Sequence, residues 1–133
     1  MGVIYPANYN FKLADGNAIL KGTDWYIEVV MADLENDIEK PINLTSYTGI
    51  CQIREDANSE TLLASPVVTI LDPLGGSFSI SLTEAETLAI PTTGKTYKDV
   101  SRYQYEVILK DDEGGDYRAL HGFVEVSPTV VKE

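Results

Sequence analysis

The sequence contains a single cysteine and a single histidine among 133 residues. The lone Cys51 excludes an internal disulfide and a zinc site built from cysteines. It lies in an alternating apolar segment with no basic residue beside it, so we expect a buried, unreactive thiol. His121 is the only histidine available to activate a nucleophile, and no serine lies in a G-x-S-x-G motif. We therefore expect a protein that is not an enzyme and that uses no cofactor.

Basic residues are also scarce. Ten Lys and Arg stand against 21 Asp and Glu, which gives a net charge of −11. This charge repels phosphate backbones and anionic membrane surfaces, so we expect neither nucleic acid nor membranes as partners. No apolar run approaches the ~20 residues of a transmembrane helix. The first residues lack the basic and apolar segments of a secretory signal, so we expect synthesis and folding in the cytoplasm.

Two stretches concentrate the carboxylates, residues 33–39 and residues 111–116. The first has oxygens at alternate positions but lacks the glycine and the final glutamate of an EF-hand loop. The second fits an exposed hairpin tip, where charges discourage edge pairing. We interpret both as solvated loops and predict no metal site. Two distant acids could still meet as in a glycoside hydrolase, although so many acids make accidental pairs common.

Alternation of apolar and polar residues is the dominant pattern. Phe78, Ile80 and Leu82 alternate with serines, and the same spacing recurs over residues 25–31 and 103–109. A period of two predicts β-strands with one buried face. We expect Trp25, Tyr103 and Tyr105 to be packed inside. In the last segment the alternating set is Leu120, Gly122, Val124 and Val126, and Gly122 suggests a bulge or a close backbone approach. We expect His121 to be partly exposed, on the same face of this strand as Tyr117, Ala119 and Phe123.

Turn-forming residues separate the strands. Asp15-Gly16, residues 72–76 and residues 113–116 are each predicted to close a hairpin. Residues 34–40 and 91–100 are predicted to be longer irregular connections. This arrangement predicts an all-β fold, a single antiparallel β-sandwich of about eight strands.

One short helix is predicted over residues 84–89. Thr83 and Glu86 have the spacing of a capping box, in which each side chain meets the other residue's backbone N–H. Such a helix would cross between the sheets of the sandwich, so we expect Leu88 and Ile90 to close one end of the core.

Four motifs occur in a recognisable order: Lys21–Trp25 (KGTDW), Pro41–Glu55, Ser81–Thr87 and Leu120–Pro128. In this order they resemble small structural proteins from the tail and baseplate gene clusters of tailed bacteriophages. Those proteins have an immunoglobulin-like sandwich similar to the N-terminal domain of phage upper-baseplate proteins. The resemblance covers residues 19–130. The sequence departs from the family pattern at Asn43, where aspartate is usual, and at Ser46, where glycine is usual.

The resemblance implies a non-enzymatic structural protein of the virion, made in the host cytoplasm and located in the tail or baseplate more than in the capsid. It implies a baseplate or tail-fibre adaptor that contacts other virion proteins within symmetric homo-oligomers or rings. A capsid decoration protein is one alternative. A carbohydrate-binding module is another, and it would need an exposed row of aromatics, with Trp25 as its best anchor.

Residues 1–18 precede the resemblance and form an N-terminal arm, followed by the sandwich domain, residues 19–133. The arm either supplies the first strand of the sandwich after a frayed tail or adds to the sheet edge of a neighbouring chain. We predict its apolar residues as a possible interface, namely Tyr5, Pro6, Tyr9 and Phe11.

Overall fold

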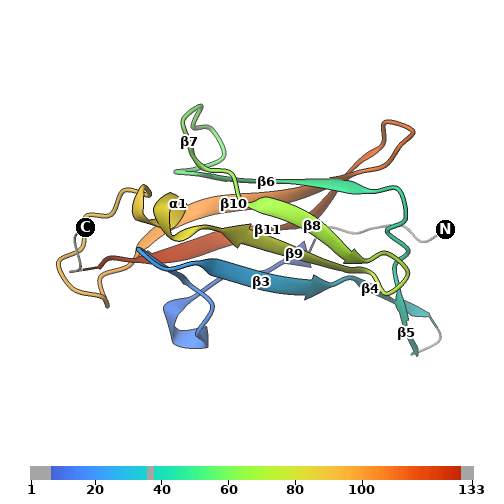
Figure 1. Ribbon diagram of the computed structural model, residues 1–133, viewed down its shortest axis with the longest axis horizontal. Helices are drawn as coiled ribbons and strands as arrows, with labels where there is room; N and C mark the ends of the chain where they lie inside the picture. Colours follow the sequence, from blue (N-terminus) through green and yellow to red (C-terminus); the bar gives the residue numbers. More distant parts are fainter. Residues whose placement is uncertain (1–6, 36–37, 130–133) are drawn as a thin grey trace.

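The computed structural model describes residues 7–35 and 38–129, which form two β-sheets packed face to face (Figure 1). Of the eleven strands in these residues, five have four residues or fewer, so the fold has more strands than the eight expected because of short additional ones. The first sheet has the order β1-β11-β10-β6-β7, with β2 also beside β11. Its strands are β1 (Ala7–Asn8), β2 (Ile19–Leu20), β6 (Thr48–Arg54), β7 (Leu62–Ala64), β10 (Ser101–Lys110) and β11 (Asp116–Ser127).

The second sheet has the order β3-β9-β8, and a separate ribbon pairs β4 with β5. These strands are β3 (Trp25–Val30), β8 (Val67–Asp72), β9 (Ser77–Leu82), β4 (Ala32–Glu35) and β5 (Ile38–Pro41). The ribbon corrects the prediction of an irregular connection over residues 34–40. The hairpins predicted at residues 72–76 and 113–116 are confirmed, since β8 pairs with β9 and β10 pairs with β11 in antiparallel fashion.

The connectivity is that of an immunoglobulin-like sandwich, in which strands B, E and D form one sheet and C, F and G the other. Here β3-β9-β8 form the first set and β6-β10-β11 the second. The hydroxyl of Tyr103, near the start of β10, donates to the carbonyl of Pro91, as in the tyrosine corner of such domains. The inter-sheet disulfide is absent, because the only cysteine lies on β6. The predicted all-β sandwich is therefore confirmed.

The core is built from the predicted alternating segments of both sheets. Phe78, Ile80 and Leu82 of β9 are buried against apolar side chains of β10 and β11. At one edge, the ring of Phe11 lies 5.3 Å from that of Trp25 and 5.0 Å from that of Tyr105. Burying one such side chain contributes about 1.5–3 kcal/mol. The predicted burial of Trp25 and Tyr105 is confirmed, while Tyr103 is only partly buried.

Helix α1 (Glu84–Leu88) has the predicted capping box: the Thr83 hydroxyl accepts from the Glu86 N–H, and the Glu86 carboxylate accepts from the Thr83 N–H. Ile90 is fully buried as predicted, but Leu88 is exposed. Thr87 takes the inward position instead, because residues three apart on a helix share a face and Thr87 aligns with Ile90. Its buried hydroxyl donates to the carbonyl oxygen of Thr23 at 2.8 Å.

The hairpin predicted at Asp15-Gly16 is wrong. The segments before and after it both run parallel to β11: Ala7 pairs with Leu120, and Ile19 pairs with Val126. Between them a 3-10 turn, Leu13–Asp15, is closed by Gly16 in the left-handed conformation. The loop that includes this turn therefore interrupts a single edge strand. An Asp-Gly pair is compatible with this 3-10 turn as well as with a hairpin turn, because each turn needs a residue with a positive φ, which glycine adopts readily.

One extra residue in β11 changes which side chains face the core. Val107 pairs with Leu120 while Ile108 pairs with Arg118, so Ala119 forms a β-bulge. The bulge brings Tyr117 to the core side and leaves His121 on the outside, partly exposed. The predicted common face of Tyr117 and His121 is therefore wrong, although the partly exposed position of His121 is confirmed.

Candidate interaction face

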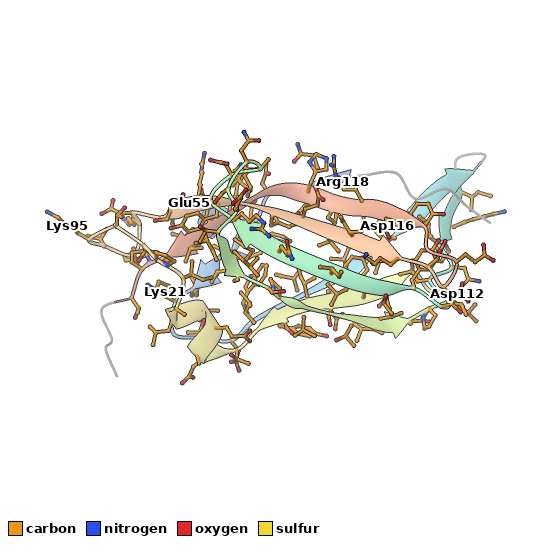
Figure 2. All side chains as sticks on the ribbon, turned by 90° about the horizontal axis from the view of Figure 1, so that it is seen from above. Lys21, Glu55, Lys95, Asp112, Asp116 and Arg118 are labelled. Carbon is orange, nitrogen blue, oxygen red and sulfur yellow. The ribbon has the colours of Figure 1, made fainter. Side chains whose placement is uncertain are left out.

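The outward side of β6, β10 and β11 has mainly polar and charged side chains. We call the outward side chains of these strands the outer face; they project away from the second sheet, as the labelled Arg118 does in Figure 2. The face contains Ile50, Gln52 and Arg54 of β6, Arg102, Gln104, Glu106, Ile108 and Lys110 of β10, and Asp116, Arg118, His121, Phe123 and Glu125 of β11.

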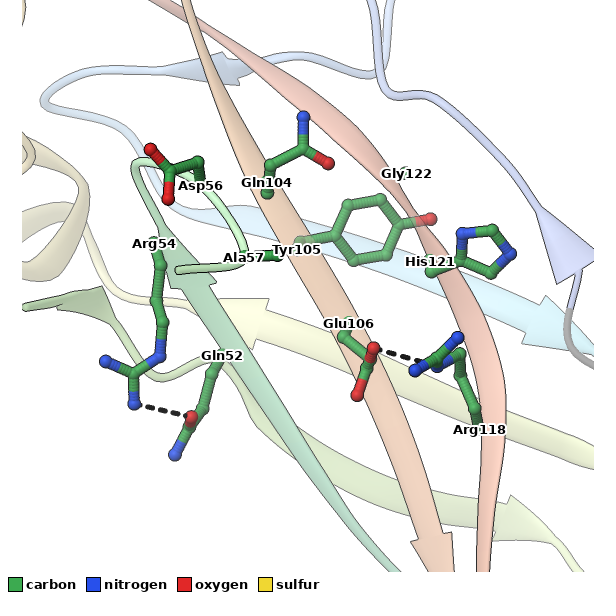
Figure 3. Close-up of a pocket in the computed structure, with 10 residues that line it drawn as sticks. All are labelled: Gln52, Arg54, Asp56, Ala57, Gln104, Tyr105, Glu106, Arg118, His121 and Gly122. Carbon is green, nitrogen blue, oxygen red and sulfur yellow. Dashed lines mark hydrogen bonds and ion pairs between the residues drawn. The ribbon is translucent and has the colours of Figure 1, made fainter. Parts of the chain in front are cut away.

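A hollow of about 440 Å³ lies on this face (Figure 3). Its walls come from β6, β10, β11 and the loop after β6, and its lining is Gln52, Arg54, Asp56, Ala57, Gln104, Tyr105, Glu106, Arg118, His121 and Gly122. We call it the groove. Because most of its lining side chains are polar, the groove is suited to hydrogen bonding with a polar surface.

Two arginines of the groove are held by neighbouring groups. Arg54 donates from Nη2 to Gln52 Oε1 at 3.0 Å and from Nη1 to the carbonyl of Glu60 at 2.8 Å, which ties the β6–β7 loop to the sheet. Arg118 Nε lies 2.8 Å from Glu106 Oε2, as the dashed line in Figure 3 marks. Within residues 7–35 and 38–129, the imidazole of His121 has no hydrogen-bond partner.

Beyond the groove, a second ion pair fixes the N-terminal loop to the outer face. Arg102 lies 4.5 Å above the Phe123 ring, and its Nε donates to Glu125 Oε2 at 2.9 Å. The other oxygen of Glu125 accepts from the Leu13 N–H at 2.9 Å. Burial by itself would raise the pKa of Glu125, but these hydrogen bonds together with the cationic charges of Arg102 and Lys12 lower it overall.

The four predicted interface residues of the arm have different positions. Tyr5 and Pro6 lie outside the described residues. Phe11 is a core residue and is unavailable to a partner while its segment stays paired with β11. Tyr9 is about half exposed, with 49% of its surface accessible. Its carbonyl accepts from the hydroxyl of Tyr105, a buried residue of β10 that also lines the groove, so the hydrogen bond attaches the backbone of the arm to the first sheet.

The other predicted groups do not form a chemical site in the described part of the chain. Cys51 is buried, and burial raises the pKa of its thiol to about 12. No group of three or more His, Cys, Asp and Glu among the described residues could hold a metal ion. The exposed tyrosines Tyr9, Tyr26 and Tyr97 come from three different segments and make no ring contact with one another.

The groove was not predicted from the sequence. The only signal was the polar set Arg102, Gln104 and Glu106, which alternates with the core residues of the same strand.

A search against protein-family models and a search among curated proteins find no match to this chain. No helix in the described residues is long and apolar enough to cross a membrane.

Proposed function

We propose that this chain is a non-enzymatic structural protein of a tailed-phage virion, an adaptor in the baseplate or tail-fibre region that acts through protein interfaces. The observation that carries the proposal is the ordered set of four motifs, on a chain whose strand order is immunoglobulin-like, as the resembled family requires. Fold alone does not determine function, so the proposal rests on the motifs and the fold together.

The described surface supports an interface protein better than a sugar-binding module. Trp25 is buried, and its Nε1 donates to the carbonyl of Asn17 at 3.0 Å inside the molecule. Stacking on a sugar ring needs an exposed aromatic, so the best anchor predicted for glycan binding is occupied by the core. Replacement of Trp25 by alanine is expected to unfold the protein instead of selectively removing an affinity for glycans.

The proposal is tested by counting copies of this chain in purified particles of the phage that encodes it, by quantitative mass spectrometry against the major capsid and tail proteins. We expect a number that corresponds to one or a few symmetric rings. Abundance matching the major shell protein would instead favour a capsid decoration protein. Absence from the particle would refute both structural roles.

A further inference from the structure

The outer face differs in charge from the rest of the molecule. The chain has three arginines, and all of them, Arg54, Arg102 and Arg118, lie on this face. With Lys110 they make four cations against three carboxylates, those of Glu106, Asp116 and Glu125. The face therefore has a net charge of only +1, and the rest of the chain has −12 of the total of −11.

Each carboxylate of the face has a cation beside it. The nitrogen-to-oxygen distances are 2.8 Å for Arg118–Glu106, 2.9 Å for Arg102–Glu125 and 3.7 Å for Lys110–Asp116. Contact through this face would add little repulsion between two copies of the chain. Contact through the strongly acidic remainder would oppose like charges, which disfavours close approach there.

The face also has apolar, aromatic and arginine side chains of the kinds that occur in protein interfaces. Ile50 exposes 43% of its surface, and strand register places it opposite the partly buried Ile108, which in turn lies opposite Arg118. Phe123 is partly buried beneath Arg102. Arginine and aromatic residues are enriched at interfaces relative to the rest of the surface.

We propose that the outer face binds a second copy of this chain in a two-fold symmetric dimer. A two-fold contact places the same surface on both sides, so Glu106 of one copy can face Arg118 of the other, and the apolar pair Ile50 and Ile108 meets its own equivalent. A strongly charged partner of either sign would gain little net attraction from a nearly neutral face. A basic partner would bind the acidic remainder instead.

This inference rests on the proposed function for the expectation of a symmetric assembly, but its test uses the purified chain alone. The concentration dependence of sedimentation velocity would be measured for the parent protein and for Ile50→Asp. We expect a monomer–dimer equilibrium whose dissociation constant rises at least about tenfold in the variant, since an unpaired carboxylate would enter the contact. The matched control is Val30→Asp, at an exposed apolar position on the other sheet, which should dimerise like the parent.

A second pair of variants covers the case in which Ile50→Asp fails to fold. Gln104→Lys adds a cation at an exposed position of the outer face, where cations already exceed carboxylates by one, and Thr69→Lys adds one to an exposed position on β8. We expect only Gln104→Lys to weaken the dimer, because it increases the like charge on both contacting faces. A parent that stays monomeric at all concentrations, a species that grows beyond a dimer, or equal effects of both variants would overturn the proposal. The virion copy number would be unaffected by such a failure.

Discussion

The carbonyl oxygen of Tyr9 lies against the backbone of Gly122, so closely that a Cβ on Gly122 would stand 2.4 Å from that oxygen. This confirms the close backbone approach predicted from the glycine. The contact joins the N-terminal segment to the middle of β11, next to the groove. A residue with a side chain at this position would push the segment away from the sheet.

Gly122→Ala is therefore expected to destabilise the protein by about 1–3 kcal/mol, because the added methyl group clashes with backbone that cannot move freely. Urea denaturation measures the loss, and hydrogen exchange should show faster opening of residues 7–11. Gly114→Ala is the control: Gly114 also has a positive φ, +86, but open space around it, so only the conformational cost of about 1–2 kcal/mol applies. Equal losses for the two variants would mean that the close approach contributes nothing.

Phe11→Ala tests whether the arm belongs to the sandwich. Phe11 is 1% exposed and contacts the rings of Trp25 and Tyr105. Its removal should leave a cavity in the core and lower the free energy of unfolding by about 3–5 kcal/mol. Tyr9→Ala, two residues earlier and half exposed, should cost far less. The thermal unfolding midpoints of the two variants are the measurement. A much lower midpoint for Phe11→Ala than for Tyr9→Ala indicates that the arm is part of the core. Small decreases for both variants would instead indicate an arm that lies on the surface.

The sequence predicted what is local and missed what depends on distant partners. The alternation along β9 and β10 determines their buried faces, since it requires only that one side of a strand be covered. The direction of residues 7–20 could not be deduced in this way. It depends on Phe11 fitting between Trp25 and Tyr105, which are far from it in the chain, and on backbone pairing with β11.

The candidate interaction face was missed for the same reason. Arg54, Arg102 and Arg118 are separated in the sequence, and each one alone is compatible with an ordinary solvated position. They come together because β6 and β11 both pair with β10. The bulge at Ala119, which no local pattern indicated, then determines that Arg118 and His121 both point outward.

Glu125 is expected to make stability depend on pH. Its pKa is lowered in the folded protein, because the hydrogen bonds from Leu13 and Arg102 and the nearby cationic charge outweigh burial, which acts in the opposite direction. A carboxyl with a lowered pKa stabilises the fold above its unfolded pKa of about 4.3, and this stabilisation is lost as pH falls through the folded pKa. Glu125→Gln should therefore cost about 1–3 kcal/mol at neutral pH.

The measurement is denaturant unfolding of parent and variant from neutral to acidic pH. The difference between them should shrink as the pH falls from the unfolded pKa of about 4.3 through the lowered pKa of the folded carboxyl. Glu55→Gln, at an exposed position on the β6–β7 loop, is the control and should show only a small difference at every pH. If the cost of Glu125→Gln were the same at all pH values, packing would explain it and the ion pair with Arg102 would not.

Cys51 gives a chemical measure of how often the core opens. Burial raises the pKa of its thiol to about 12, so at pH 8 almost none of it is the reactive thiolate, and the side chain is only 1% exposed. We expect reaction with a thiol reagent such as Ellman's reagent to be very slow in the native protein and fast in denaturant. Gly122→Ala and Phe11→Ala should accelerate the native reaction in proportion to their loss of stability, if labelling requires global opening. A fast reaction in the parent that these variants leave unchanged would place the thiol at an accessible position, contrary to the structure.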